Sequence, residues 1–319
     1  MPYANRLNLN FWVTPVIILA FAVAIAVPGL LGRYGLEIGF QLMLYIVLTE
    51  AWNMLAGYGG LVSLGSAAFI GVGAYIFTGF FNGHISNDVA LALLAAGLVG
   101  AFFAGIVAPA LLRMRGLYFT VGTLAFAEAL RIFVVNTPWF GGSTGLYLNI
   151  NFPTNTQLYL WAFGLMVFSE LAMCLFTQSR LSIFLCAIRD DEDAAAQLGV
   201  RTVYGKTMAF CIAGFFMAMG GGLQAYNLGA VEPDGLFGMQ WSINILIIVV
   251  IGGLGQRLGA IIGTFFIVAL GELLAGYPAI HVISTAIILI IIIRFAPKGI
   301  TGFLMKSWQR VVTMKQDVA

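Results

Sequence analysis

Residues 89–112 read VALALLAAGLVGAFFAGIVAPALL, 24 consecutive positions without a charged side chain. A helix needs about 20 mostly apolar residues to cross the hydrocarbon core of a bilayer. Similar segments recur along the whole chain, and we therefore predict an all-α, polytopic transmembrane helical bundle with about ten spans. The number falls to eight if the Gly- and Ser-rich third segment and the short eighth segment are re-entrant. The segments lie at about 12–31, 37–56, 63–81, 89–112, 117–136, 158–178, 206–226, 240–255, 258–276 and 279–295.

The composition of the chain points to the same class of protein. Of its 319 residues, 61% are hydrophobic and 9% are charged, whereas roughly a quarter of the residues in an ordinary soluble domain are charged. The mean hydropathy is +0.98. A transmembrane β-barrel would alternate apolar and polar residues, but the apolar runs here are continuous. We expect a single transmembrane domain over residues 1–319, without a sizeable soluble domain.

The positions of the lysines and arginines indicate how the chain is oriented in the membrane. Cytoplasmic loops of membrane proteins carry an excess of these residues. If the N-terminus lies in the cytoplasm and the spans alternate, only Arg33 and Arg131 of the 15 basic residues do not fall at a cytoplasmic end. We therefore expect an even number of spans and both termini in the cytoplasm.

Two connections between the predicted spans are longer than the others. Residues 137–157 carry no charge and are expected outside, whereas residues 179–205 are the most charged stretch and are expected in the cytoplasm. Within the inner loop, residues 187–198 predict a short helix, because acids occupy its first turn and Gly199 suits the position just past its end. This helix is either a solvated loop element or a docking element for a soluble partner.

Five ionisable side chains fall at membrane depth, where a charge is costly and is a functional candidate by default. Glu128 and Arg131 are three residues apart on one span, which is the spacing of an ion pair on a helix. Glu50, Glu170 and Glu272 lie on three other spans. The five residues either line a polar route or combine a structural ion pair with acids that face buried amides.

Small residues recur at every fourth position in three spans. Such stripes let helix backbones approach closely, which is a main source of helix association in lipid. We expect them to be packing surfaces, with a glycine-lined pathway as the alternative. The stripes are Ala92, Ala96, Gly100, Ala104 and Ala108, then Gly214, Ala218 and Gly222, and then Gly255, Gly259 and Gly263.

The sequence carries no pattern that is typical of an enzyme. The three cysteines and two histidines lack the spacing of metal ligands, and no nucleophile elbow is present. Gly199, Gly205 and Lys206 imitate a phosphate-binding loop. That loop requires four residues between its glycines and a preceding strand, and here five residues separate the glycines and a helix precedes them. We expect no catalytic residue, no metal and no cofactor bound by this chain.

The chain also carries a set of short motifs, in order, between about residues 45 and 305. They are NMLAGYGGLVSLGSAAFIGVGAY at 53–75, RGLYF at 115–119 with TLAFAE at 123–128 and GGSTG at 141–145, AIRDDEDAAAQLG at 187–199, GGLG at 252–255 and FAPKG at 295–299. Together they resemble the LivM-type permease subunits of branched-chain amino acid ABC importers. Each motif alone is short, but the set is specific to that family.

The resemblance implies an assembly in the bacterial inner membrane. The permease would pair with a second, homologous permease subunit, two cytoplasmic ATPases would bind and hydrolyse Mg-ATP, and a periplasmic solute-binding protein would deliver a small-molecule substrate. No nucleic acid would take part. The inner-loop helix would be the coupling helix seated in a groove of one ATPase, within a coupling loop at about 179–205. Its contact residues would be Arg189, Asp190, Asp191, Glu192, Asp193, Ala194, Ala195, Ala196, Leu198 and Gly199.

The expected function is passive translocation of branched-chain or other hydrophobic amino acids along a pathway near the seam between the permease subunits. Departures from the family pattern at Ser66, Asp193 and the Gln256-Arg257 pair keep the substrate open, with urea or an aromatic or organic acid as alternatives. An ion-coupled secondary transporter, which would use a midplane ion site, is the alternative of another class. The candidate pathway residues are Asn53, Ser63, Ser66, Glu50 and Asn244.

Overall fold

The computed structural model describes residues 32–83, 88–149, 153–295 and 299–302. The predicted first span at 12–31 lies outside this part of the chain, and so do both termini. The expected location of both termini in the cytoplasm therefore stays a prediction. The same holds for the basic residues Arg6, Lys298, Lys306, Arg310 and Lys315.

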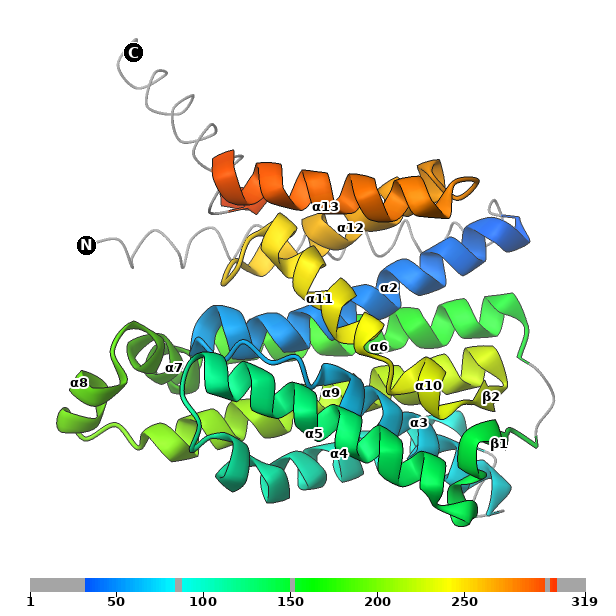
Figure 1. The fold of residues 1–319 in the computed structure, drawn as a ribbon, viewed down its shortest axis with the longest axis horizontal. Coiled ribbons are helices and arrows are strands. Elements are labelled where there is room, and N and C mark those ends of the chain that lie inside the picture. The colour runs from blue at the N-terminus through cyan, green and yellow to red at the C-terminus, as the bar shows by residue number, and fades with distance from the viewer. Residues whose placement is uncertain (1–31, 84–87, 150–152, 296–298, 303–319) are drawn as a thin grey trace, which may run out of the picture.

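A helix corresponds to each of the other nine predicted spans (Figure 1). Six helical segments of the described part are long and apolar enough to cross a membrane. The helical bundle is therefore confirmed, and the exact number of spans stays a prediction. The helices are α2 (Arg33–Asn53), which continues into the π-helical turn η2 (Met54–Tyr58), α3 (Ser66–Asn82), α4 (Val89–Leu111), α5 (Leu117–Asn136), α6 (Asn155–Gln178), α9 (Thr202–Leu228), α11 (Met239–Gly252), α12 (Arg257–Leu273) and α13 (Pro278–Phe295).

Two of the predicted small-residue stripes face one another where α4 packs against α9. A Cβ atom added at Gly214 of α9 would lie 2.9 Å from the Cβ of Ala104 on α4, and one added at Gly100 would collide with Ala218. Ala92, Ala96, Ala104, Ala108 and Ala218 are fully buried. Close packing is therefore what these stripes provide, and α9, together with α2, is the most buried of the candidate spans.

The two long connections lie at opposite ends of the bundle (Figure 1). In the connection at 137–157, the 3-10 turns η3 (Pro138–Phe140) and η4 (Gly142–Thr144) lead into β1 (Leu146–Tyr147). This strand pairs antiparallel with β2 (Ala230–Val231), so that Leu146 lies opposite Val231. The short helix α10 (Pro233–Leu236) follows β2, and these elements cap one end of the bundle.

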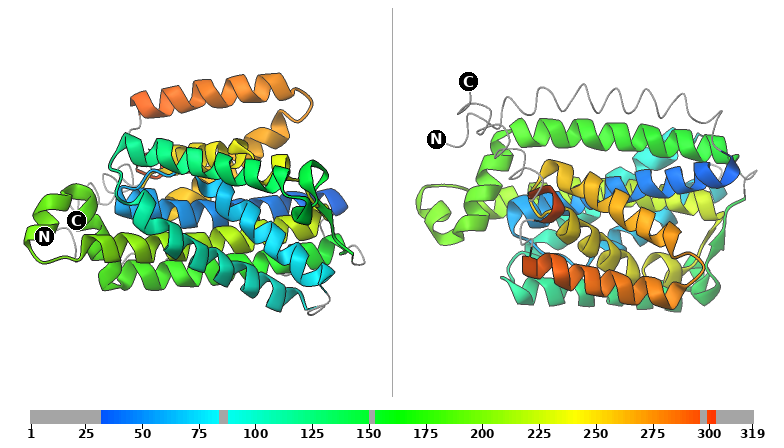
Figure 2. Two further views of the ribbon diagram at one scale, coloured as in Figure 1. Left: turned by 60° about the horizontal axis from the view of Figure 1, so that its bottom comes forward. Right: turned by 90° about the horizontal axis from the view of Figure 1, so that it is seen from above.

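The connection at the other end forms two helices, α7 (Arg180–Asp190) and α8 (Glu192–Gln197), which project beyond the other helices (Figures 1 and 2). The prediction of one continuous helix over 187–198 is therefore wrong. The chain breaks at Asp191, whose φ of −159° and ψ of 108° are extended, and whose side chain accepts a hydrogen bond from the backbone of Ala194. Asp is a strong N-cap residue, and here its capping interaction starts a new helix in place of continuing the first.

Candidate functional site

The end of the bundle that carries α7 and α8 collects the charged side chains of several connections. The α4–α5 connection contributes Arg115, the start of α9 contributes Lys206, and Arg257 begins α12 at the same end (Figure 1). The clustering of basic residues that the sequence predicts is thus present in the described part of the chain.

A single arginine joins α7 to the end of α2. Nη1 of Arg189 donates a hydrogen bond of 2.7 Å to the backbone oxygen of Gly57, within the π-helical turn η2. The last carbonyl groups of a helix have no partner within the helix, and a basic side chain there also interacts favourably with the helix dipole. Arg189 therefore satisfies a group that the end of α2 leaves open.

Glycines allow the chain segments to approach at this point. A Cβ atom at Gly57 would lie 2.6 Å from the Cα of Gly255, in the connection between α11 and α12, and one at Gly60 would lie 2.8 Å from Cγ of Arg189. Gly60 also has a φ of +68° and Gly255 a φ of +72°, a region that side chains rarely adopt. Two of the motif segments, 53–75 and 252–255, are therefore in direct backbone contact.

Asn53 fixes this contact from the side of α2. Its Oδ1 accepts a hydrogen bond of 2.8 Å from the backbone N–H of Gly255, and its Nδ2 donates one of 3.1 Å to the backbone oxygen of Gln256. Asn53 is fully buried, so both bonds are largely shielded from solvent on its side. We call Asn53, Gly57, Arg189 and Gly255 the junction, because they join α7, the end of α2 and the α11–α12 connection.

The acids of α8 pair with basic residues of the same chain. Nζ of Lys206 lies 2.6 Å from Oε1 of Glu192, and the Lys206 side chain is only 6% exposed. Arg115 lies 3.3 Å from Asp193 and 3.8 Å from Glu192. A cleft of about 410 Å³ separates α7 and α8 from the α4–α5 connection, and Arg115 reaches from that connection to the acids.

Apolar side chains are exposed at the same end, among them Leu198 of the predicted contact set. Leu198, just after α8, is 85% exposed, and Val203 and Tyr204 in the first turn of α9 are exposed as well. Gly199 has a φ of +84° and ends α8 as the sequence predicts, which leaves Leu198 at the turn. We call Leu198, Val203 and Tyr204 the apolar tip. The three lie within seven residues of the sequence, and an exposed apolar patch typically marks an interaction site.

Four of the five predicted pathway residues are buried in the packing of this chain. Ser63, Ser66, Asn53 and Glu50 are buried, and Asn53 belongs to the junction. Asn244 is part-buried and donates to the hydroxyl of Tyr45 at 3.4 Å. A role in lining a pathway stays a prediction for all five.

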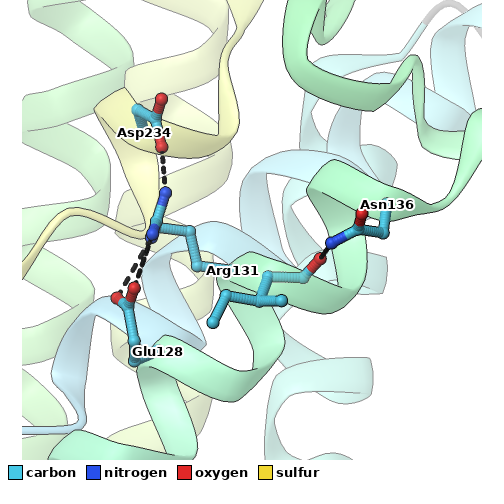
Figure 3. Close-up of polar contacts among 5 residues, drawn as sticks. Glu128, Arg131, Asn136 and Asp234 are labelled. Atoms are coloured by element: carbon cyan, nitrogen blue, oxygen red, sulfur yellow. Dashed lines mark hydrogen bonds and ion pairs between the residues drawn. The ribbon is translucent and has the colours of Figure 1, made fainter.

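Glu128 and Arg131 form the contact that their spacing on α5 suggests (Figure 3). Nε of Arg131 lies 3.0 Å from both carboxyl oxygens of Glu128. Arg131 also contacts Asp234 at the start of α10, a partner that the sequence analysis missed because it is 103 residues away. The arginine thus ties α5 to the cap formed by β2 and α10.

The other three acids at membrane depth differ in their surroundings. Glu272 accepts a hydrogen bond from the hydroxyl of Tyr34 on α2. Glu50 and Glu170 are buried, and among the described residues their carboxyl oxygens have no hydrogen-bond partner.

Comparison with known proteins shows what this chain is similar to. A family profile described as the permease component of a branched-chain amino acid transport system matches residues 35–296. The high-affinity branched-chain amino acid transport system permease protein LivM of Salmonella typhimurium is 28% identical over 87% of this chain and 72% of its own length, and LivM of Escherichia coli is 27% identical over the same shares. The autoinducer 2 import system permease protein LsrC of Salmonella paratyphi B is 26% identical over 67% of this chain and 62% of its own length. No solved structure matches.

Proposed function

Because the chain belongs to the family of permease components of branched-chain amino acid transport systems, we propose that it is the passive membrane subunit of an ABC importer. It is a multi-pass membrane protein, and we place it in the bacterial inner membrane because its LivM and LsrC relatives are permease proteins of bacterial transport and import systems. A translocation role needs no catalytic side chain, and we expect this chain itself to bind no cofactor. ATP hydrolysis, with Mg-ATP as the nucleotide, falls to separate partner subunits.

The observation that supports this mechanism best is the junction. Arg189 contacts the end of α2 through Gly57, and Asn53 ties the same end of α2 to the α11–α12 connection. A displacement of α7 would therefore act both on the end of α2 and, through Asn53, on the α11–α12 connection. Rigid packed elements of this kind carry motion between distant sites.

The apolar tip is the surface that we assign to the partner ATPase. The acids at 190–193 are engaged within the chain, because Glu192 and Asp193 pair with basic residues and Asp190 pairs with its neighbour Arg189. They orient α8 and leave Leu198 to enter an apolar groove of the ATPase. Within the contact set that the sequence analysis names, this proposal gives the main role to Leu198, and it adds Val203 and Tyr204.

The complete importer also needs a second permease subunit and a periplasmic solute-binding protein. We propose that the second permease subunit is homologous to this chain and that the seam between the two contains the pathway. The described chain exposes large apolar side chains on several helices, which is compatible with contact to lipid and to another subunit.

The proposed substrates are branched-chain or other hydrophobic amino acids. The LivM relatives align over a larger share of the chain than the LsrC relatives do, which favours an amino acid over an autoinducer. Urea and aromatic or organic acids remain the alternatives that the sequence departures suggest.

Uptake by the reconstituted importer tests this function. Proteoliposomes that contain the permease subunits and the ATPases are given a loaded binding protein and radiolabelled leucine. Mg-ATP is supplied on the side of the membrane that the ATPases face. We expect leucine uptake only with ATP, and no uptake by this chain alone under a proton or sodium gradient. Uptake driven by an ion gradient without ATPases would favour the secondary transporter and contradict the proposal.

A further inference from the structure

Glu128, Arg131 and Asp234, here called the ion network, lie on a face of the bundle that the described part of the chain leaves open. The Glu128 side chain is 48% exposed and the Asp234 side chain is 76% exposed. Figure 3 shows the Arg131 guanidinium between the two carboxyl groups, one from α5 and one from α10. The network therefore contains two acids and one base, and both acids are open to whatever lies beside this face.

The ion network lies well inside the span. Glu128 is eight residues before Asn136, the last residue of α5, which corresponds to about 12 Å along a helix axis. Arg131 is five residues before the same end, and its contact with Asp234 places the start of α10 at a similar depth. Charged side chains at membrane depth almost always face the interior of a bundle or a water-filled cavity. The exposed carboxyl groups therefore indicate a face that does not contact lipid.

The break between α10 and α11 leads to the same conclusion independently. Residues Pro233–Gly252 are apolar enough to form one span, but α10 ends at Leu236 and α11 begins only at Met239. Gly235, next to Asp234 in the network, is exposed. Irregular backbone at membrane depth is tolerated only where protein buries it or where it lines a water-filled cavity. Lipid is therefore excluded on the α10 side of the network as well.

The exposed side of α5 has the shape that a neighbouring helix needs. α5 is the least buried of the six candidate spans in the described part of the chain. Ala125 and Ala129 lie on either side of Glu128 and are exposed, and residues four positions apart share one face of a helix. Small residues at this spacing let another transmembrane helix approach closely.

The exposed side of α4 has the opposite character. Its exposed residues are bulky and apolar, as at Leu94, Leu98, Phe102 and Ile106, and Val89–Leu111 contains no charged residue. Lipid tails are as apolar as leucine side chains, so this surface is suited to lipid. Two neighbouring spans of one chain thus differ in what can cover them.

We propose that the exposed face of α5 around the ion network packs against the second permease subunit. This inference rests on the proposed function and names the face of this chain that forms the seam. A soluble partner does not reach the depth of Glu128, whereas a transmembrane helix fits beside Ala125 and Ala129. A carboxylate has about four acceptor sites, more than one guanidinium shared by two carboxylates fills. The partner helix therefore presents hydrogen-bond donors to Glu128 and Asp234.

Photo-crosslinking in the complete importer tests this assignment. Ile132 is replaced by a photoreactive phenylalanine derivative, because it lies four positions after Glu128 on the same face and is 49% exposed. The matched control is the same replacement of Leu94 on α4, which is 43% exposed. Leu94 is five residues from the end of its helix and Ile132 is four residues from the end of its own. We expect an adduct with the second permease subunit from position 132 and no protein adduct from position 94.

The other outcomes contradict either this inference or the proposed function. An adduct from position 132 with the same chain or with the solute-binding protein would overturn the inference, and so would the absence of any protein adduct. An adduct with the second permease subunit from position 94 alone would assign the seam to α4. A purified complex that lacks a second permease subunit contradicts the proposed function itself, whereas a complex that contains it and is not cross-linked from position 132 contradicts this inference alone.

Added bulk on the same face gives a second measurement that needs no cross-linker. Ala125→Trp on α5 and Val99→Trp on α4 both enlarge an exposed side chain, so that the new group has room in the described chain. We expect Ala125→Trp to lower the amount of second permease subunit that co-purifies by about tenfold or more, because a close contact is overpacked. Val99→Trp should leave that amount unchanged. Equal amounts with the two variants, both eluting as intact protein, would overturn the inference.

Discussion

Arg189 on α7 and Gly57 at the end of α2 are 132 positions apart in the sequence and are joined by one hydrogen bond of 2.7 Å. The acceptor is a backbone carbonyl, so the contact depends on the position of the helix end and on no other side chain. Gly57 also packs against Gly255. The position of Arg189 on α7 is therefore linked both to the end of α2 and to the α11–α12 connection.

Close backbone packing at the junction predicts that Gly57→Ala destabilises the protein. The added Cβ would collide with Asn53 and lie 2.6 Å from the Cα of Gly255. We expect a loss of about 1–3 kcal/mol of unfolding free energy, the usual cost of overpacking, measured by denaturant unfolding in detergent. The matched control is Gly79→Ala on α3, where nothing lies within 4 Å of the new atom and stability should be unchanged or slightly higher. Equal effects at the two glycines would refute tight packing at Gly57.

The ion pairs of α8 predict different costs for two neighbouring acids. Glu192→Gln leaves Lys206 buried without its carboxylate partner. We expect a loss of about 2 kcal/mol of unfolding free energy, below the roughly 3–5 kcal/mol of a fully buried pair because the Glu192 side chain is 24% exposed.

Asp193→Asn is the control for this change. The Asp193 side chain is 73% exposed, and exposed ion pairs contribute only about 0–1 kcal/mol. Denaturant unfolding of the two variants in one detergent compares them directly. If Asp193→Asn cost as much as Glu192→Gln, the burial of Lys206 would not be the source of the effect.

The apolar tip predicts that Leu198→Asp weakens assembly without unfolding the permease. A buried apolar anchor at an interface is typically worth about 2 kcal/mol or more, so the affinity for the ATPase should fall about thirtyfold. Affinity is measured with purified ATPase and permease in nanodiscs. Gln197→Ser, at the neighbouring exposed position of α8, should bind as the native chain does. If Leu198→Asp bound the ATPase as tightly as the native chain does, the apolar tip would not be part of the interface.

The arrangement of the two long connections predicts which side of the membrane each faces. In a variant without Cys174, Cys186 and Cys211, single cysteines are introduced as Leu198→Cys and Trp139→Cys, at positions that are both highly exposed. A membrane-impermeant maleimide added to spheroplasts should label the cysteine at 139 and should not label the cysteine at 198. Labelling of the cysteine at 198 from outside would reverse the orientation and exclude contact with a cytoplasmic ATPase.

Local patterns in the sequence were sufficient for the helices and for the distribution of basic residues. The uncharged run at 89–112 became α4, and its small-residue stripe packs against Gly214 and Ala218 of α9, because close packing requires only small side chains at helical spacing. Gly199 ends α8 as predicted, since a positive φ favours glycine.

Interactions between distant residues were not predictable from the sequence. Whether Asp191 continues a helix or caps a new one depends on where α8 is held, and the ion pairs with Lys206 and Arg115 hold it. In the same way, the sequence marks Asn53 only as a polar pathway candidate, and the fold adds that its amide oxygen accepts a bond from, and its amide nitrogen donates a bond to, the α11–α12 connection. Each of these outcomes is decided by a partner far away in the chain.

The ratio of substrate imported to ATP hydrolysed, measured with Arg189→Ala in the reconstituted importer, tests the central role of the junction most directly. The hydrogen bond to Gly57 involves a charged donor, for which the net contribution is about 1.5–3 kcal/mol. We predict that ATP hydrolysis continues while uptake per ATP falls about tenfold or more, whereas Arg180→Ala, at an exposed position of the same helix, keeps the native ratio. A native ratio in Arg189→Ala would contradict transmission through the contact between α7 and the end of α2.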